Sequence, residues 1–353
     1  MASKINPHFS EELKKYGSVN FNACYNCGNC TAVCSLSTPD DSFPREMVRL
    51  SALGLEEEMK QSLKPWECYY CGECTAQCPQ TANPGELMMS LRRWLTAQYD
   101  WTGLSGLLYR SLTLTIAALL LVAAGVFFFA RTVNFETETL LHTGHLFEML
   151  AIATVFLVIF VPNLLRMWYF TIVKNGVKVP LKSYFTALSE LFVHMLTQKR
   201  AKDCDAKDNF RWLEHLVLVF AYLSLLFTTV FLNWFGTESF FVVVLGYVES
   251  FLIFVITTHF VSERIKRNKA LNRFSQPSDW LFVIWLLLMG LTAFMVRLFI
   301  DLNILENNIW IYLIHLTVLA QWALIIVPFG KWTHFLYRSF GLYFARIKVI
   351  QKS

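Results

Sequence analysis

The sequence predicts an all-α protein in which a cysteine-rich N-terminal domain, residues 1–100, precedes a bundle of six transmembrane helices, residues 101–353. Three observations predict this fold class. Eight of the 9 cysteines lie between residues 24 and 78, the chain after about residue 106 forms long apolar runs, and 55% of the residues are hydrophobic. A composition this apolar is unusual for a soluble domain and typical of a membrane protein.

The first 23 residues are polar and lack the apolar core and cleavage site of a secretory signal, so we expect the N-terminus in the cytoplasm. In that reducing compartment, crowded cysteines indicate metal ligation rather than disulfides. Cys204 stands apart in a charged loop and is interpreted as a free thiol. The net charge of +5 is spread over several loops without interleaved aromatic residues, which argues against a nucleic-acid partner.

Two cysteine motifs share the spacing C-x2-C-x2-C-x3-C, which is typical of ligands to [4Fe-4S] clusters. They comprise Cys24, Cys27, Cys30 and Cys34, and then Cys68, Cys71, Cys74 and Cys78. The fourth cysteine of such a motif usually reaches the other cluster. The expected ligand sets are therefore Cys24, Cys27, Cys30 with Cys78, and Cys68, Cys71, Cys74 with Cys34. Structural zinc is the alternative, but zinc is normally bound by paired C-x2-C units.

The segment between the two motifs, residues 44–63, carries apolar residues at helical intervals and has Pro44 at its start. This pattern favours an all-helical domain with two [4Fe-4S] clusters over the small β-rich ferredoxin.

Six apolar runs follow, and within lipid each must be helical to satisfy its own backbone hydrogen bonds. They span residues 108–130, 145–168, 212–234, 240–261, 280–300 and 309–331. Lysine and arginine concentrate in residues 170–211 and 262–274, which predicts that these loops and both termini face the cytoplasm. Residues 182–199 form an amphipathic segment that we expect along the inner membrane surface.

Histidines at the ends of these crossings indicate haem b, which takes an imidazole on each face of its iron from facing helices. His215 and His334 are expected at the inner ends of the third and sixth helices, where they can share an inner haem. His315 and His145 are expected nearer the outer face, where they can share a second haem. His259 is a further candidate at the inner end of the fourth helix. Any one of these histidines taken alone is more often a packed or interfacial residue than a ligand.

Two other ionisable residues within the crossings are singled out. Glu249 lies near the middle of the fourth helix, where a charge is costly, and this makes it a functional candidate. Proton transfer, a quinone contact and a structural hydrogen bond are the alternative roles for Glu249. Arg297, near the outer end of the fifth helix, is either a partner of a haem propionate or an interfacial residue.

The order of these features resembles the membrane subunit of the quinone-interacting membrane-bound oxidoreductase family. The N-terminal half is similar to the iron-sulfur C subunit of heterodisulfide reductase, and the membrane half is similar to the cytochrome b subunits of respiratory nitrate reductase and methanogen heterodisulfide reductase. The likeness is carried by CYNCGNCTAVC, CYYCGECTAQCP, SDWLFVIWLLLMGLTAFMVRL and VPFGKWTHFLYR. In the nitrate reductase subunit, two haem ligands lie thirteen residues apart on an early helix, but Thr228 occupies that position after His215. The resemblance therefore implies one or two haems b.

The resemblance also implies an activity in the cytoplasmic membrane of a bacterium or archaeon. Menaquinol would be oxidised, and electrons would pass through haem b and the two clusters to flavin-containing iron-sulfur partner subunits, with adenylylsulfate reductase of sulfur metabolism as the final acceptor. The chain lacks a G-x-G-x-x-G motif, so the flavins are expected in the partners, and the chain is one part of an enzyme. The alternatives are a subunit of a heterodisulfide-reductase-like complex and a membrane-anchored iron-sulfur redox sensor.

Overall fold

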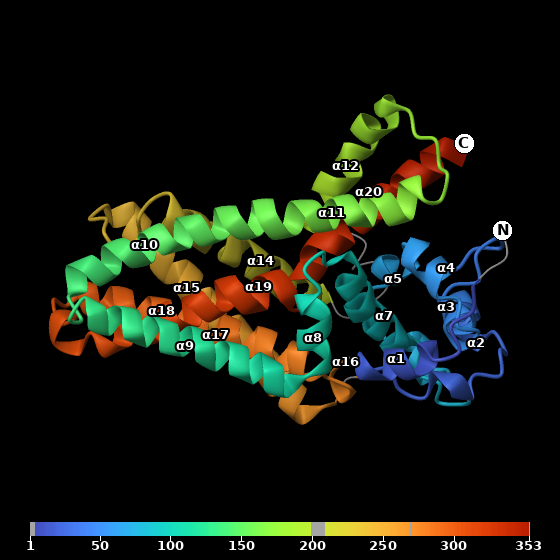
Figure 1. Cartoon of the computed structure of the whole chain (residues 1–353), viewed down its shortest axis with the longest axis horizontal. Helices are drawn as coiled ribbons and strands as arrows, with labels where there is room; N and C mark the ends of the chain where they lie inside the picture. The colour runs from blue at the N-terminus through green and yellow to red at the C-terminus, as the bar shows by residue number, and fades with distance from the viewer. Residues whose placement is uncertain (1–3, 199–208, 269, 353) are drawn as a thin grey trace.

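The computed structural model describes residues 4–198, 209–268 and 270–352. Its described residues fold into helices, and their one extended pairing is an isolated bridge between Thr38 and Asp41. The molecule is elongated, with a small N-terminal domain at one end of a long helical bundle (Figure 1). The predicted all-α class is confirmed.

The N-terminal domain consists of short helices around one long helix. In chain order these are α1 (Phe9–Lys15), η1 (Phe21–Ala23), α2 (Asn29–Ala32), α3 (Arg45–Ala52), α4 (Glu56–Gln61), α5 (Lys64–Glu67), α6 (Glu73–Ala76) and α7 (Pro84–Tyr99). The helical segment expected between the cysteine motifs is present as α3 and α4. It is broken at Gly54, which has a φ of 71°, and a Cβ there would collide with the carbonyl of Asn6.

Six helices of the bundle are long and apolar enough to cross a membrane, as predicted, so the chain is a multi-pass membrane protein. The short helix α8 (Leu104–Arg110) leads into them. The six are α9 (Leu112–Thr132), the continuous run of α10 (Thr137–Thr154), η2 (Val155–Phe160), α11 (Val161–Trp168) and η3 (Tyr169–Val173), then α14 (Asn209–Val230), α15 (Phe240–Lys266), α17 (Pro277–Asp301), and last α18 (Trp310–Gln321) with η5 (Trp322–Ile326) and α19 (Val327–Phe329). The remaining short elements are α16 (Ala270–Arg273) and η4 (Glu306–Asn308).

Every crossing differs from its expected bounds by at least one residue, and two differ most. The second begins at Thr137 rather than at 145, because the polar first turns of α10 are helical although they are not apolar. The sixth does not continue straight to 331. It passes through the π-helical turns of η5, stops at Gly330, and resumes as α20 (Thr333–Lys352). His334 therefore lies in the first turn of a new helix.

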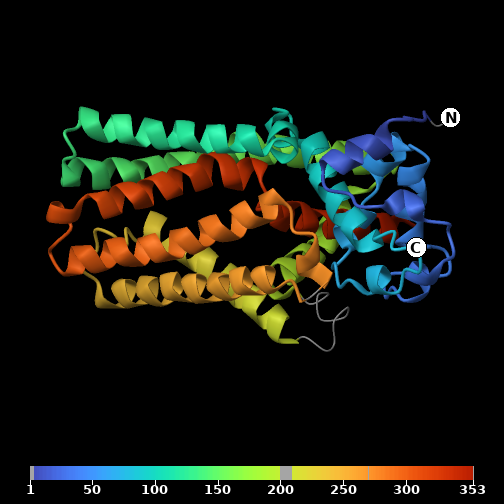
Figure 2. The same cartoon turned by 90° about the horizontal axis from the view of Figure 1, so that it is seen from below.

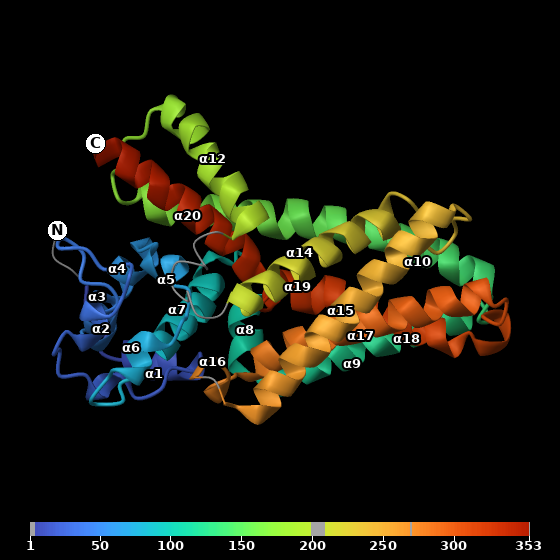
Figure 3. The ribbon, with the colours of Figure 1, turned by 180° about the vertical axis from the view of Figure 1, so that it is seen from behind.

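The amphipathic segment forms α12 (Leu181–Thr197), which projects from the bundle and packs along α20 (Figure 3). The Tyr343 hydroxyl donates to the carbonyl of Tyr184 at 3.0 Å. Leu181 and Phe185 remain exposed on the other side of α12, so it keeps an apolar face. Its location along the membrane surface stays a prediction. Lys199, Arg200, Lys202, Cys204 and Lys207 fall outside the described residues.

The N-terminal domain and the bundle share one hydrophobic core. Trp66 and Tyr99 from the N-terminal domain lie against Tyr337 of α20, with ring centroids 5.6 and 5.5 Å from it. Gly341 allows α20 to approach this closely, because a Cβ there would come within 2.8 Å of Trp66. Both chain ends lie at this end of the molecule (Figure 2). The second cysteine motif is thereby fixed against the end of the bundle.

Candidate redox site

The eight motif cysteines are free thiols and fall into two groups. Burial raises the pKa of Cys30, and the neighbouring thiols of Cys24, Cys27 and Cys78 raise it further. Burial likewise raises the pKa of Cys34, whose thiol neighbours are Cys68 and Cys71. Cys78 is therefore near the first motif and Cys34 is near the second, as the crossed sets require, and the ligand sets themselves stay a prediction.

Short loops present these thiols to a ligand. Gly28 and Gly72 have φ values of 93° and 90° and begin α2 and α6, so each loop turns sharply beside its cysteines. Backbone amides of Asn26 and Tyr70 donate to the sulfurs of Cys24 and Cys68 at 3.4 and 3.3 Å. No three His, Cys, Asp or Glu side chains of the described chain converge on a single metal ion. A cubane does not require such convergence, because its thiolates attach to separate corners.

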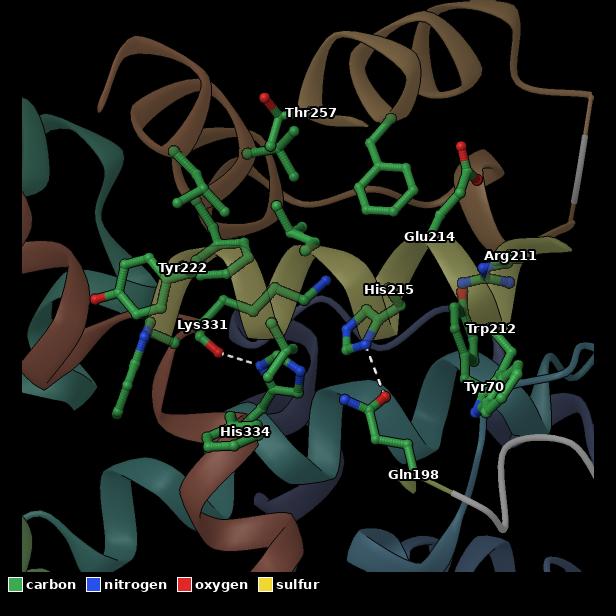
Figure 4. Close-up of a pocket in the computed structure, with 18 of the residues that line it drawn as sticks. Tyr70, Gln198, Arg211, Trp212, Glu214, His215, Tyr222, Thr257, Lys331 and His334 are labelled. Atoms are coloured by element: carbon green, nitrogen blue, oxygen red, sulfur yellow. Dashed lines mark hydrogen bonds between the residues drawn. The ribbon is translucent and has the colours of Figure 1, made fainter. Parts of the chain in front are cut away.

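A cavity of about 300 Å³ lies between the second cysteine motif and the bundle. Tyr69, Tyr70 and Cys71 line it from the N-terminal domain, while His215 and His334 line it from α14 and α20. Its remaining walls combine aromatic and aliphatic side chains with charged ones such as Arg211, Glu214 and Arg264. Figure 4 shows the imidazoles of His215 and His334 in this cavity, each with a hydrogen bond to a neighbouring residue.

Both imidazoles use the same ring nitrogen for that contact. Nδ1 of His215 donates to the side-chain oxygen of Gln198 at 2.7 Å, and Nδ1 of His334 donates to the carbonyl of Lys331 at 2.5 Å. Each ring is thus held in the tautomer that leaves Nε2 available as a ligand. Metal-binding histidines are typically oriented in this way by a partner on the other nitrogen.

The same cavity contains an uncompensated cation. Arg338 lies with its guanidinium 4.1 Å from the centre of the Tyr69 ring, and within the described chain its Nε and Nη2 are buried without a hydrogen-bond partner. A buried charged donor without an acceptor is costly. A ligand that places a carboxylate there would remove this cost, and haem b carries two. The residues present therefore fit a bis-histidine haem.

The comparisons with known proteins concern the N-terminal region. Residues 23–83 match the family model described as "4Fe-4S dicluster domain". The N-terminal region is a 4Fe-4S dicluster domain. Residues of this chain are also 28% identical over 98 residues to a protein of Archaeoglobus profundus described as similar to the C subunit of heterodisulfide reductase. That alignment covers 28% of this chain and 52% of the relative, so it spans about half of the relative's length. No solved structure matches the chain.

A buried ionic network joins the dicluster domain to the bundle. Arg93 of α7 lies 2.9 Å from Asp279 of α17 and 3.5 Å from Glu86, while Lys331 lies 2.8 Å from the other oxygen of Asp279. The Tyr70 hydroxyl donates to Glu86 at 2.5 Å. Burial raises the pKa of Glu86 to about 7 although Arg93 and the Tyr70 hydroxyl oppose the shift. Sequence analysis missed this network, because it joins residues up to 186 positions apart.

The two other predicted residues lie at opposite ends of the bundle. His259 lines the same cavity, and its Nδ1 lies 2.7 Å from Glu214 without hydrogen-bond geometry. Arg297 lies towards the far end of α17, where it pairs with Asp301 at 2.7 Å and donates to the carbonyl of Trp234.

The outer histidines are not brought together in either of the two described cavities. His315 is buried, and its Nδ1 contacts the Thr292 hydroxyl at 2.9 Å. His145 is half-buried on α10, next to Gly144, where a Cβ would collide with the Tyr312 hydroxyl of α18. The helices that carry His145 and His315 are therefore in contact, whereas a shared haem stays a prediction.

Glu249 is buried and accepts hydrogen bonds from Ser224 and, at 3.0 Å, from Thr228. A second buried carboxyl, Glu148, accepts from Thr229 at 3.1 Å. Sequence analysis missed Glu148, although the reasoning that selected Glu249 applies equally to an acid within the second crossing.

Proposed function

We propose that this chain is the membrane electron-transfer subunit of a quinone-linked oxidoreductase complex. Electrons would pass between menaquinone, haem b and the two [4Fe-4S] clusters, and then to soluble partner subunits. One observation carries the proposal: a single cavity is lined by two oriented imidazoles of the bundle and by Cys71 of the dicluster domain. An electron carrier in that cavity would lie beside a cluster.

Within this proposal, His215 and His334 hold the haem iron, and Arg338 receives a propionate. The bound haem would supply reversible one-electron transfer. Arg338 suits the propionate role better than Arg297, because Arg297 already has two acceptors at the other end of the bundle. The eight cysteines hold the clusters in the crossed sets. An outer haem at His315 and His145 remains the second possibility for haem number.

The partner subunits follow from the resemblance alone. We propose flavin-containing iron-sulfur subunits as the immediate acceptors and adenylylsulfate reductase as the final one, in a bacterial or archaeal cytoplasmic membrane with both termini inside. The relative from Archaeoglobus profundus supports a second candidate, a heterodisulfide-reductase-like complex. The proteins that co-purify with the chain under anaerobic conditions separate these two candidates.

The proposed function is tested on the anaerobically purified protein by a reduced-minus-oxidised visible spectrum and by EPR. We expect a b-type α-band and two cluster signals. His215→Ala and His334→Ala should each lose the band while the cluster signals persist, and His8→Ala, at an exposed surface position, should change neither. Iron-free protein would refute the proposal. Cluster signals without any haem band would favour the redox sensor.

A further inference from the structure

A second cavity, of about 230 Å³, lies where the dicluster domain meets the first and fifth crossings. We propose that it binds the ring of the membrane quinone; this inference rests on the proposed function and gives it a substrate site. The cavity lies at the end of the bundle that carries the clusters, since Leu112 begins α9 and Pro277 begins α17, and both line it.

The lining of this cavity divides into an apolar part and a polar part. Leu108, Leu281, Ile326 and Phe329 supply apolar walls. Tyr16, Tyr109, Arg93 and Lys331 supply polar groups. An apolar cavity of about 150 Å³ already accommodates benzene. A larger cavity with hydrogen-bond donors in its lining therefore suits a flat aromatic ring that carries carbonyl or hydroxyl groups.

The two buried cations of the cavity favour a neutral ring over a phosphate, whereas Lys15 and Arg110 are exposed at its edge. Arg93 and Lys331 are both paired with Asp279, at 2.9 and 2.8 Å, and Arg93 also lies 3.5 Å from Glu86. Both cations therefore already have an acidic partner within the protein. An anionic lipid headgroup needs uncompensated cations, whereas a quinone oxygen needs only a donor.

The cavity has an apolar edge that faces lipid. Leu112 is 46% exposed, and Leu114 and Ile116 beyond it on α9 are similarly exposed. An isoprenoid tail can leave the cavity along this face into the bilayer. Lys15 and Arg110, which are exposed, line the cavity on the side of the dicluster domain, where water is available.

One residue is shared by this cavity and the histidine cavity. Lys331 lines both, and its carbonyl accepts the Nδ1 proton of His334. A ring in the second cavity is thus one residue from the candidate haem ligand. On oxidation, the quinol would break its two O–H bonds, release two protons to water at the Lys15 and Arg110 edge, and give two electrons, one at a time, to the iron centres of the chain. Both protons would leave at the cluster-bearing end.

The test combines photolabelling with reduction kinetics on the full chain with its cofactors. An azido-naphthoquinone should label peptides from residues 104–115 and 277–281. Leu281→Trp fills the cavity and should abolish both the labelling and the reduction of the iron centres by a naphthoquinol. Ile284→Trp lies on the lipid-facing side of the same helix and should leave both unchanged. Dithionite should still reduce every centre in both variants, which separates a lost quinone site from lost cofactors.

Tyr109→Phe provides a variant that preserves volume and folding. Loss of one hydrogen bond to the ring should weaken quinol binding by roughly 10-fold, and the visible spectrum should not change. Labelling that maps instead to peptides around Glu249 or His315, or wild-type kinetics in Leu281→Trp, would overturn the assignment. A phospholipid retained in native mass spectra and lost in Leu281→Trp, with an unchanged quinol reaction, would identify a lipid site instead. If wild-type protein contains haem and clusters but no quinol reduces them, the proposed function itself fails.

Discussion

Arg93 of the dicluster domain and Asp279 of α17 form a buried ion pair of 2.9 Å across the boundary between the two parts of the chain. Lys331 pairs with the same carboxylate, so one acid holds a cation from the dicluster domain and a cation from the last crossing. Removing one member of a buried pair leaves the other charges uncompensated, and this is far more costly than losing a surface pair. Asp279 therefore fixes the dicluster domain on the bundle.

Asp279→Asn should lower the free energy of unfolding by about 3–5 kcal/mol, because two buried cations lose their counter-ion. The measurement is thermal unfolding of the purified chain, followed by loss of cluster absorbance. Glu57→Gln is the matched control, since it breaks a more exposed pair with Lys174 that also joins the two parts of the chain, and it should cost about 0–1 kcal/mol. Equal losses in the two variants would contradict this role of Asp279.

Some features of this molecule could be predicted from local sequence. The six crossings could be predicted from hydropathy, because a helix that crosses lipid needs a long run of apolar residues and such a run is visible in the sequence. The helical segment after Pro44 follows from periodicity, and the dicluster domain follows from cysteine spacing. The bounds of the second crossing could not be predicted in this way, since the polar residues before His145 join the helix through backbone hydrogen bonds that hydropathy does not report.

The rest of the site depends on contacts between distant segments. Arg93, Asp279 and Lys331 each look like ordinary interfacial residues until the fold brings them together. Gln198 could not be identified from the sequence as a site residue, because its hydrogen bond to His215 depends on the fold. Glu148 did carry a signal, as an acid within a crossing. The second cavity could not be predicted, since a cavity is a property of packing.

Gln198 should control the affinity of the haem without being a ligand. Gln198→Ala removes the acceptor for Nδ1 of His215, and loss of such a partner typically costs about 10–100-fold in metal-site affinity. Haem retention should fall during detergent washing, and the haem midpoint potential should shift. Gln198→Glu retains an acceptor and should retain haem. If Gln198→Ala keeps wild-type haem content and potential, His215 is not oriented through this contact.

The crossed ligand sets predict which cluster each fourth cysteine supports. Cys78→Ser should perturb the cluster held by Cys24, Cys27 and Cys30, although Cys78 belongs to the other motif. Cys34→Ser should perturb the cluster beside Cys68 and Cys71. The two clusters can be distinguished by EPR, because only the second adjoins the histidine cavity and should couple magnetically to an oxidised haem. Signals lost in the opposite order would show that each motif binds its own cluster.

Glu86 should make the stability of the chain depend on pH. Burial raises its pKa to about 7 from an ordinary value near 4.5, so between these values the folded state binds more protons than the unfolded state. Stability from the neutral carboxyl is therefore present below about pH 4.5 and is lost as pH rises through about 7, by on the order of 3 kcal/mol. The groups that face Glu86 are Tyr70, Arg93 and Asp279.

Glu86→Gln cannot ionise, so its advantage over the wild-type chain should grow between pH 5 and 8 in thermal unfolding. The comparison of variant with wild type removes the contributions of other titrating groups. Glu238→Gln, at an exposed loop position, should follow the wild-type profile. A constant difference between Glu86→Gln and wild type over this range would mean that Glu86 is already ionised in the folded state at the lowest pH.

Glu249 should be a structural residue rather than the quinone site. Its carboxyl is buried and accepts hydrogen bonds from Ser224 and Thr228 of the neighbouring helix, and it lines neither described cavity. Glu249→Gln keeps a side-chain oxygen for these donors, so stability and naphthoquinol-driven reduction of the iron centres should stay close to wild type. Glu249→Ala leaves the two hydroxyls without their acceptor and should lower stability by about 1–3 kcal/mol. A Glu249→Gln variant that folds normally but reacts slowly with quinol would instead place quinone or proton chemistry at this carboxyl, since the substitution removes its proton exchange and little else.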